Sequence, residues 1–190
     1  MGKDDKKNAL VIEIKGDMSH KANVATNLLS DLFSINYISS RSPSLHICLD
    51  AEFIINDLDY FQSSLAKVLI NIPTFTIIGR GLGIFVAETP VVYIRWHISE
   101  KLLHFKHLVS NFLNHSQNEG VISNYSIDLN WIPKTTLAYQ DTSYKALSDI
   151  ISAIFHIDFS SSMDVDSLFT YEYSIKNGEK RLSTLQLKPG

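Results

Sequence analysis

Two short segments of this chain share one pattern of residue types. They read Leu45-His46-Ile47-Cys48-Leu49 and Pro133-Lys134-Thr135-Thr136-Leu137. Each segment contains a basic residue, then any residue, then a small thiol or hydroxyl residue, and then a leucine. A helical pattern follows each segment along the chain. Alternating apolar and β-branched residues are typical of half-buried strands, so we predict that both segments are β-strands.

Each predicted strand has one aliphatic face and one face with chemical groups. In the first segment we expect Leu45, Ile47 and Leu49 to pack against a covering helix, because residues two apart share a face. The opposite face is predicted to carry the side chains of Ser44, His46, Cys48 and Asp50.

If the two strands face one another, two nitrogen groups and two small S/O groups line one cleft. The nitrogen groups belong to His46 and Lys134, and the small groups belong to Cys48 and Thr136. A phosphodiester site needs such a set, namely a base, an acid and short donors for the non-bridging oxygens. The repeated pattern therefore predicts a phosphate site between the two strands.

The remaining segments indicate an α+β fold with a mainly antiparallel sheet. Strand-like runs occupy residues 9–14, 75–78, 83–87, 91–96, 168–175 and 180–187, and residues 127–139 are extended. One helix is predicted after Ser19 as its N-cap, a second over 58–69 with Asp57 as its cap, and a third over 99–114. A fourth is predicted from the helical spacing of Leu147, Ile150, Ile151, Ile154 and Phe155. Several loops between strands are too short for a parallel crossover, which excludes a doubly wound sheet.

Glycine-containing segments predict two tight connections. The run from Gly79 to Gly83 is interpreted as a link between two strands, because no helix follows that would make it a dinucleotide-binding or phosphate-binding loop. Asn177-Gly178 predicts a type I′ hairpin. We expect one bilobal domain over residues 1–190, since no linker-like tract divides the chain.

Composition limits the class of protein. The chain has 190 residues, 45% of them hydrophobic, which is enough for a core and too balanced for disorder. With 17 basic and 20 acidic residues its net charge is −3, which argues against a long nucleic-acid duplex as ligand but allows a local phosphate pocket. A lone cysteine excludes an internal disulfide framework, and we expect a cytoplasmic protein with no membrane partner.

With these motifs the chain resembles the two-histidine (2H) phosphoesterase superfamily, in the branch of bacterial 2′-5′ RNA ligase and cyclic phosphodiesterase proteins. The family carries two H-x-[T/S] motifs on related strands of a bilobal, pseudo-twofold α+β fold. The resemblance covers nearly the whole chain, and its most specific part is the setting of the second motif, in Trp131, Pro133, Thr136, Leu137 and Ala138. It implies two mainly antiparallel sheets with outer helices around a central cleft.

The chain departs from the family pattern at two positions. Lys134 stands where the family has its second histidine, and Cys48 stands where threonine or serine is usual. A lysine side chain has a reference pKa of about 10.4 and is a poor proton shuttle unless desolvation lowers that value. A thiol donates a weaker hydrogen bond than a hydroxyl. The resemblance therefore supports phosphate binding more firmly than turnover.

Two functions from different classes stay open. In the first, the protein is a metal-independent cyclic phosphodiesterase without a cofactor, with His46 and Lys134 as catalytic residues and Cys48 and Thr136 as phosphate-binding residues. Its ligand is a 2′,3′-cyclic phosphate, a small nucleotide-like phosphodiester or an RNA end, and we expect a monomer. In the second, a degenerate family member binds a phosphate-bearing ligand or a protein partner without turnover.

Other chemistry-bearing residues have plainer interpretations. His104 and His107 lie opposite the apolar stripe of their predicted helix with no carboxylate to complete a metal site, so we expect no metal there. Cys48 shows no independent sign of activation as a nucleophile. The aromatic residues near the motifs are expected to be core or cleft wall, with base stacking as the alternative; they are Trp131, Tyr139, Phe85 and Tyr93.

Overall fold

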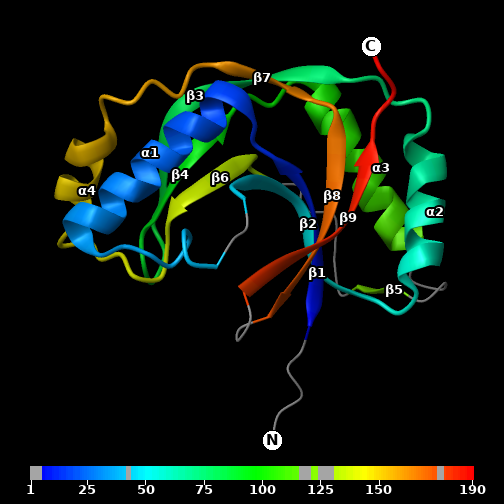
Figure 1. The fold of residues 1–190 in the computed structure, drawn as a ribbon, viewed down its shortest axis with the longest axis horizontal. Helices are drawn as coiled ribbons and strands as arrows, with labels where there is room; N and C mark the ends of the chain where they lie inside the picture. Colours follow the sequence, from blue (N-terminus) through cyan, green and yellow to red (C-terminus); the bar gives the residue numbers. More distant parts are fainter. Residues whose placement is uncertain (1–5, 42–43, 116–120, 124–130, 175–177) are drawn as a thin grey trace, which may run out of the picture.

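The computed structural model describes residues 6–41, 44–115, 121–123, 131–174 and 178–190 (Figure 1). Along the chain the elements are β1 (Lys7–Glu13), α1 (Gly16–Phe33), β2 (His46–Ile55), α2 (Leu58–Leu69), β3 (Phe75–Phe85), β4 (Val91–Trp96), α3 (Glu100–His115), β5 (Val121–Ser123), β6 (Lys134–Ala138), α4 (Leu147–Ile154), β7 (Ser162–Val165), β8 (Ser167–Ser174) and β9 (Gly178–Gln186).

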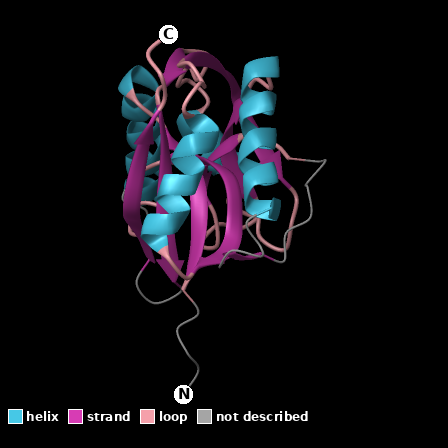
Figure 2. Cartoon of the chain, turned by 90° about the vertical axis from the view of Figure 1, so that its right-hand side faces the viewer, coloured by secondary structure: helices cyan, strands magenta, loops and turns pink. Residues whose placement is uncertain are grey.

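The strands form two sheets that are antiparallel at every described pair. One sheet has five strands in the order β5-β2-β1-β8-β9, and the other has four in the order β6-β4-β3-β7. Helices α1 and α4 lie together on one side of the molecule and α2 and α3 on the other (Figure 1), where they cover the strands of the five-stranded sheet (Figure 2). The predicted α+β fold with two antiparallel sheets and outer helices is confirmed.

One apolar core joins the two halves, and a smaller cluster lies on the other face of the five-stranded sheet. Alternate residues of β1 divide between them, since Leu10 and Ile12 belong to the main core whereas Ala9 and Val11 belong to the smaller cluster. Fully burying one such aliphatic side chain stabilises the fold by about 1.5–3 kcal/mol. Cys48 packs against the smaller cluster, so this face of the sheet carries the first motif.

The helices follow their sequence signals with two differences. Asp57 caps α2 as predicted, because its carboxylate accepts a hydrogen bond of 2.9 Å from the Tyr60 backbone N–H. Helix α1 begins at Gly16, so the cap predicted at Ser19 is wrong. Ile154 is fully buried, but Phe155, expected to be buried beside it, is 71% exposed because α4 ends at Ile154.

The segment from Gly79 to Gly83 is the clearest correction to the predicted strands. It does not connect two strands but lies inside β3, which pairs with β7 through its first half and with β4 through its second. The pairing shifts register between Gly79 and Leu82, where Gly81 has φ +77°. A Cβ atom on Gly83 would collide with the ring of Tyr93, so these glycines allow close packing inside a strand.

Two predicted features lie partly outside the described residues. The β8–β9 hairpin is present and Gly178 has φ +68°, but Asn177 of the predicted turn is not described. Of the extended segment predicted over 127–139, the part from 131 onward is described, and it contains β6.

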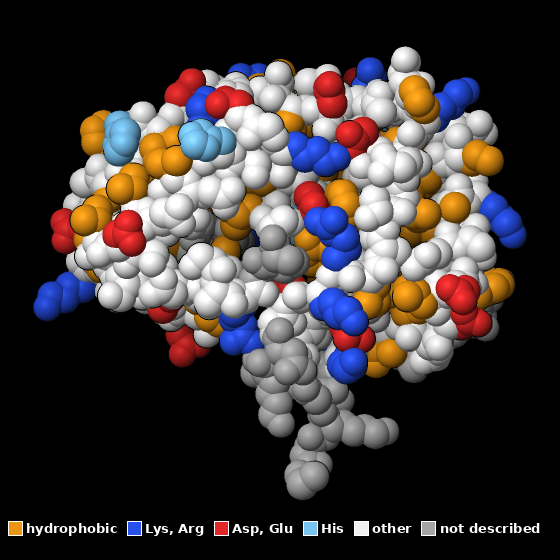
Figure 3. All heavy atoms as spheres, viewed as in Figure 1, with side chains coloured by type: hydrophobic (Ala, Val, Ile, Leu, Met, Phe, Trp, Pro, Cys, Tyr) orange, Lys and Arg blue, Asp and Glu red, His pale blue; other side chains and the backbone are white. Residues whose placement is uncertain are grey.

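The charged side chains are distributed as the small net charge suggests. Lysine and arginine side chains run down the middle of one face, between the half with α1 and α4 and the half with α2 and α3, and acidic side chains lie among them (Figure 3). No helix in the described part of the chain is long and apolar enough to cross a membrane.

Candidate functional site

The two motif segments lie on strands from different sheets that approach one another. β2 begins at His46 and β6 begins at Lys134, and the two strands are in contact. Ile47, Leu49 and Leu137 are buried as the alternation predicts. Leu45, predicted to share the face of Ile47, is half-buried and lines the pocket, because it precedes the first residue of β2. The side chains on the opposite face of each motif strand therefore lie between the two sheets.

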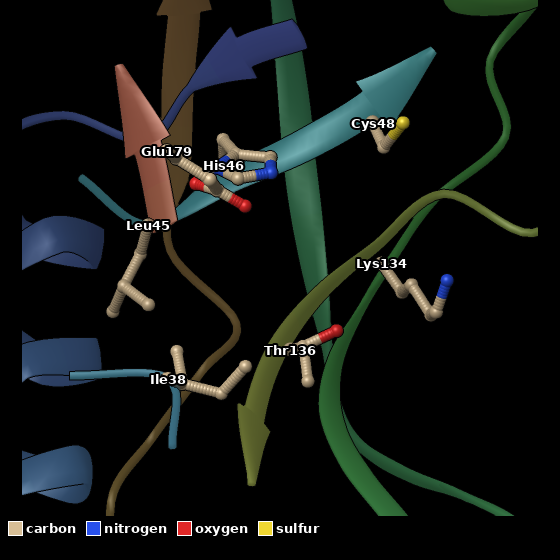
Figure 4. Close-up of a pocket in the computed structure, with 7 residues that line it drawn as sticks. All are labelled: Ile38, Leu45, His46, Cys48, Lys134, Thr136 and Glu179. Carbon is tan, nitrogen blue, oxygen red and sulfur yellow. Dashed lines mark ion pairs between the residues drawn. The ribbon is translucent and has the colours of Figure 1, made fainter. Parts of the chain in front are cut away.

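All four predicted site residues line one pocket of about 440 Å³. His46 and Cys48 come from β2, and Thr136 and Lys134 come from β6 on the opposite side (Figure 4). The remaining lining residues are Ile38, Leu45 and Glu179. The structure thus brings together two basic side chains and two small polar ones, each pair contributed by a different sheet.

His46 is held in one orientation. Its Nδ1 atom lies 3.0 Å from the carbonyl oxygen of Ser44, and because a carbonyl only accepts, Nδ1 carries the proton and donates it. In the neutral ring this leaves Nε2 as the hydrogen-bond and proton acceptor. A ring oriented in this way is prepared to act as a general base.

A buried network supports the His46 ring from behind. The Tyr171 ring packs edge-on against it at 5.5 Å between centroids. The Tyr171 hydroxyl donates to the Glu13 carboxylate over 2.6 Å and lies 2.7 Å from the Ser44 hydroxyl. Burial, helped by the Glu13 carboxylate, raises the pKa of Tyr171 to about 12, so this phenol keeps its proton. The network thereby holds the segment that orients His46.

Lys134 contributes a positive charge to the pocket. Its Nζ lies 5.5 Å from the centroid of the Phe85 ring, and among the described residues no carboxylate is within ion-pair distance of it. Arg95 of β4 is directly opposite Lys134 in the strand pairing and so shares its face of the sheet. Like charges at directly opposed positions destabilise a sheet.

The small residues of the two motifs differ in character. Burial raises the pKa of Cys48 to about 12, and the nearby Lys134 charge only partly opposes the effect. The thiol is therefore neutral at physiological pH, which agrees with its interpretation as a weak donor and not as a nucleophile. The half-buried Thr136 offers a hydroxyl to the pocket (Figure 4).

Trp131 connects the two motif strands. It precedes β6, and its indole N–H donates to the backbone carbonyl of Cys48 on β2 over 3.0 Å. Because this hydrogen bond and the packing of its ring against the core hold the side chain in place, Trp131 belongs to the core, one of the two roles predicted for it.

Asp50 does not share the face of His46 and Cys48, contrary to the prediction. Val11 pairs with Cys48 but Leu10 pairs with Asp50, so β2 has one extra residue at Leu49. Such a bulge reverses the alternation, and the buried Asp50 carboxylate turns toward α3. There it accepts hydrogen bonds from Lys106 over 2.9 Å and from Ser110 over 2.7 Å. Asp50 is therefore an anchor between β2 and α3.

Glu179 lines the pocket with an ionisable side chain, and the sequence analysis did not predict it as a site residue. Its carboxylate lies 3.9 Å from His46 Nδ1, and its backbone N–H donates to the Arg41 carbonyl over 2.9 Å. It follows the hairpin glycine, and nothing in its local sequence points toward the pocket. Arg95 was missed for a related reason, since only the β4–β6 pairing places it beside Lys134.

The helix histidines do not contribute to this pocket. His104 and His107 are exposed on α3, as their positions opposite the apolar stripe predict. Within the described ranges, no group of three or more histidine, cysteine or acidic residues could hold a metal ion.

The fold has clear counterparts among solved structures. The protein TT0787 of Thermus thermophilus matches with a TM-score of 0.69 at 14% identity, over 96% of this chain and 98% of that one. E. coli LigT in complex with NADP+ matches with a TM-score of 0.61 at 15% identity, and in complex with 3′-AMP with 0.59 at 14%, each over 96% of this chain and 98% of LigT.

Sequence comparisons add nothing to this result, because no family model and no curated protein matches the chain. At 14–15% identity the structural likeness concerns the fold. The resemblance to the 2H phosphoesterases, first suggested by the motifs, is thus confirmed as a likeness of fold over nearly the whole chain.

Proposed function

We propose that this chain, which has the fold of the 2H phosphoesterases, binds a 2′,3′-cyclic phosphate or a related small nucleotide-like phosphodiester between β2 and β6 and hydrolyses it. One observation carries the proposal, namely the convergence of His46, Cys48, Lys134 and Thr136 from two sheets in one pocket. Two basic groups and two short donors are what a phosphoryl group needs for binding and reaction.

The proposed reaction is attack of water on the phosphorus atom. His46 takes a proton from that water at Nε2, because Nδ1 already donates to the Ser44 carbonyl. As the new P–O bond forms, the bond from phosphorus to one ribose oxygen breaks, that oxygen takes a proton from solvent water, and the protonated His46 returns its proton to the solvent. Lys134 stays charged and offsets the negative charge that develops on phosphorus, while Thr136 and Cys48 donate hydrogen bonds to the non-bridging oxygens.

Known complexes of proteins with this fold support a small phosphate-bearing ligand. LigT of E. coli has been crystallised with 3′-AMP, with ATP and with phosphate. The pocket described above has a basic side chain on each side, His46 from β2 and Lys134 from β6.

A specific observation favours a second candidate function, namely binding without turnover of a phosphate-bearing ligand or a protein partner. Lysine stands in the position of the second histidine, and the thiol of Cys48 is neutral and a weak donor. Loss of one proton-transfer group removes a contribution of about 10²–10⁴ in rate, yet leaves the charge that attracts a phosphate.

Hydrolysis and binding measured side by side separate the two. Hydrolysis of the four nucleoside 2′,3′-cyclic phosphates is assayed with the wild type, with His46→Ala and with His104→Ala as a control on the exposed face of α3. Activity that is lost only in His46→Ala supports the phosphodiesterase.

The binding arm uses adenosine 3′-monophosphate with the wild type and Lys134→Ala. Binding that weakens in Lys134→Ala and falls as salt rises, without hydrolysis of the cyclic phosphates, supports the second candidate. A wild type that neither binds this nucleotide nor hydrolyses the cyclic phosphates contradicts the phosphodiesterase and the binding of a phosphate-bearing ligand, and leaves only the protein partner of the second candidate.

A further inference from the structure

The last strand of the five-stranded sheet, β9, has one edge on which no described strand lies. Among the described residues β9 pairs with β8 alone. The Leu187 backbone N–H donates to the Asp166 carbonyl over 2.7 Å, and in an antiparallel pair alternate residues turn their backbone groups toward the partner strand. The backbone groups of Thr184 and Gln186 therefore point away from β8, and both residues are exposed. This edge offers them as hydrogen-bond donors and acceptors.

Two backbone contacts bound the open stretch of this edge. At one end the Glu179 N–H donates to the Arg41 carbonyl over 2.9 Å. At the other end the Lys188 N–H donates to the Ile72 carbonyl, and the Lys188 carbonyl accepts from the Thr74 N–H, each over 2.9 Å. The chain thus already pairs at one end in the manner of an added strand, and the stretch between the two contacts is the part of the edge that stays open in the described structure.

An apolar groove of about 750 Å³ adjoins this edge, where β9 ends beside α2 (Figure 1). Leu185 and Leu187 line it on the strand side, and Leu69 and Ile70 line it at the end of α2. Leu69 and Leu187 are buried, whereas Ile70 is 67% exposed at the rim. A strand added to the edge would send every second side chain to the face on which Leu185 and Leu187 lie, and so into the groove.

The charged side chains at the groove are basic. Lys67 of α2 and Lys188 after β9 line it, and both are exposed. No described carboxylate is within ion-pair distance of either lysine. The exposed Lys180 stands near the start of the same strand. A second copy paired antiparallel along β9 would bring the Lys188 end of one strand against the Lys180 end of the other, so like charges disfavour a symmetric dimer there. An acidic partner is complementary to this surface.

We propose that this edge and groove dock an extended acidic segment of a partner protein, which adds a strand to β9. The segment pairs its backbone with Thr184 and Gln186, places alternate apolar side chains in the groove, and presents carboxylates to Lys67 and Lys188. Main-chain hydrogen bonds supply affinity in this mode of binding, and pockets for alternate side chains supply specificity. The groove shares no lining residue with the pocket between β2 and β6, so the inference does not depend on the proposed function.

A synthetic peptide tests the docking of an acidic strand. The probe is fluorescein-labelled Asp-Glu-Val-Thr-Leu-Thr-Val-Glu-Asp, titrated at low salt by fluorescence anisotropy. We expect saturable binding, and amide hydrogen exchange at Thr184 and Gln186 should slow by about tenfold in the complex, because both N–H groups become paired. A matched peptide methylated on the backbone nitrogens of its two threonines cannot donate to β9 and should bind about tenfold more weakly. Equal affinity for the two peptides overturns strand addition.

Charge exchange tests the groove. Lys67→Glu combined with Lys188→Glu should weaken binding about tenfold, and a peptide with lysines in place of its acidic residues should bind this double variant and not the wild type. Lys101→Glu combined with Lys145→Glu changes the net charge equally at exposed positions elsewhere and should preserve binding of the acidic peptide. Hydrolysis of the cyclic phosphates should be the same in both double variants, which separates this surface from the motif pocket.

Three other outcomes overturn the inference. Absence of saturable peptide binding overturns it directly. Sedimentation of the wild type alone as a dimer, with the Thr184 and Gln186 amides already protected, assigns the edge to a second copy. Binding of a nine-nucleotide oligothymidylate that is lost in Lys67→Glu combined with Lys188→Glu, without binding of the peptide, assigns the lysines to a nucleic acid.

Discussion

Replacing Lys134 with histidine is expected to raise the rate at which this protein hydrolyses nucleoside 2′,3′-cyclic phosphates. Position 134 shares its face of β6 with Thr136, so an imidazole there enters the pocket that already contains His46. An imidazole has a reference pKa of about 6.5 and exchanges a proton at neutral pH, whereas a lysine, with about 10.4, stays charged. The variant would then have a proton-transfer group on each sheet.

The expected gain is about 10²-fold in kcat/KM. A general acid or base contributes about 10²–10⁴, and the pocket already has the oriented His46 and the Thr136 hydroxyl. Two features place the single variant at the low end of that range. The substitution removes a charge that attracts phosphate, and the Cys48 thiol, with its pKa raised to about 12, stays a weak neutral donor. Adding Cys48→Thr is expected to raise the gain to about 10³-fold.

The assay compares kcat/KM of the wild type, the single variant and the double variant on the four cyclic phosphates. Lys101→His on the exposed face of α3 controls for a new histidine in general, and His46→Ala combined with Lys134→His should abolish the gain. If both histidine variants keep wild-type rates while their melting temperatures are unchanged, the missing proton-transfer group is not what limits turnover. The mechanism proposed here would then be refuted.

Three further predictions concern stability and reactivity. Asp50→Asn removes the buried carboxylate that forms an ion pair with Lys106 and should lower the free energy of unfolding in urea by about 3–5 kcal/mol, whereas Asp31→Asn at an exposed position should change it by less than about 0.5 kcal/mol. Iodoacetamide should alkylate Cys48 far more slowly in the native protein than in denaturant at pH 8, because the pKa of the thiol rises from 9.0 to about 12 on folding. Equal alkylation rates in the two states would contradict this raised pKa. The same shift should make the free energy of unfolding fall as pH rises from 9 toward 12. Ile154→Ala should destabilise the fold by about 2–5 kcal/mol and Phe155→Ala hardly at all, and thermal unfolding that shows equal losses would contradict the position of the α4 end.

Local periodicity in the sequence was enough to predict the fold class and the two motif strands. Alternation along β6 and from His46 to Leu49 of β2 identifies which side chains face the core, because successive residues of a regular strand point to opposite sides. For the same reason the sequence could place His46 with Cys48 and Lys134 with Thr136, and the repeated pattern suggested that the two pairs face one another. The capping of α2 by Asp57 is equally local.

Only the tertiary structure could decide the features that depend on strand pairing. The bulge at Leu49 turns Asp50 to the far side of its sheet, and it is visible only when β2 is aligned with β1. The glycines of β3 resemble a turn in the sequence, but Gly79 and Gly83 make room for Phe159 and Tyr93, which only the folded chain brings against them.

The same reason explains why the additional groups around the pocket were missed. Glu179 lines it from the hairpin, and Arg95 lies beside Lys134 through the β4–β6 pairing. Their neighbours in the sequence carry no trace of these contacts. Such positions follow from how distant strands align, which is determined by packing of the whole chain and not by the pattern of any one segment.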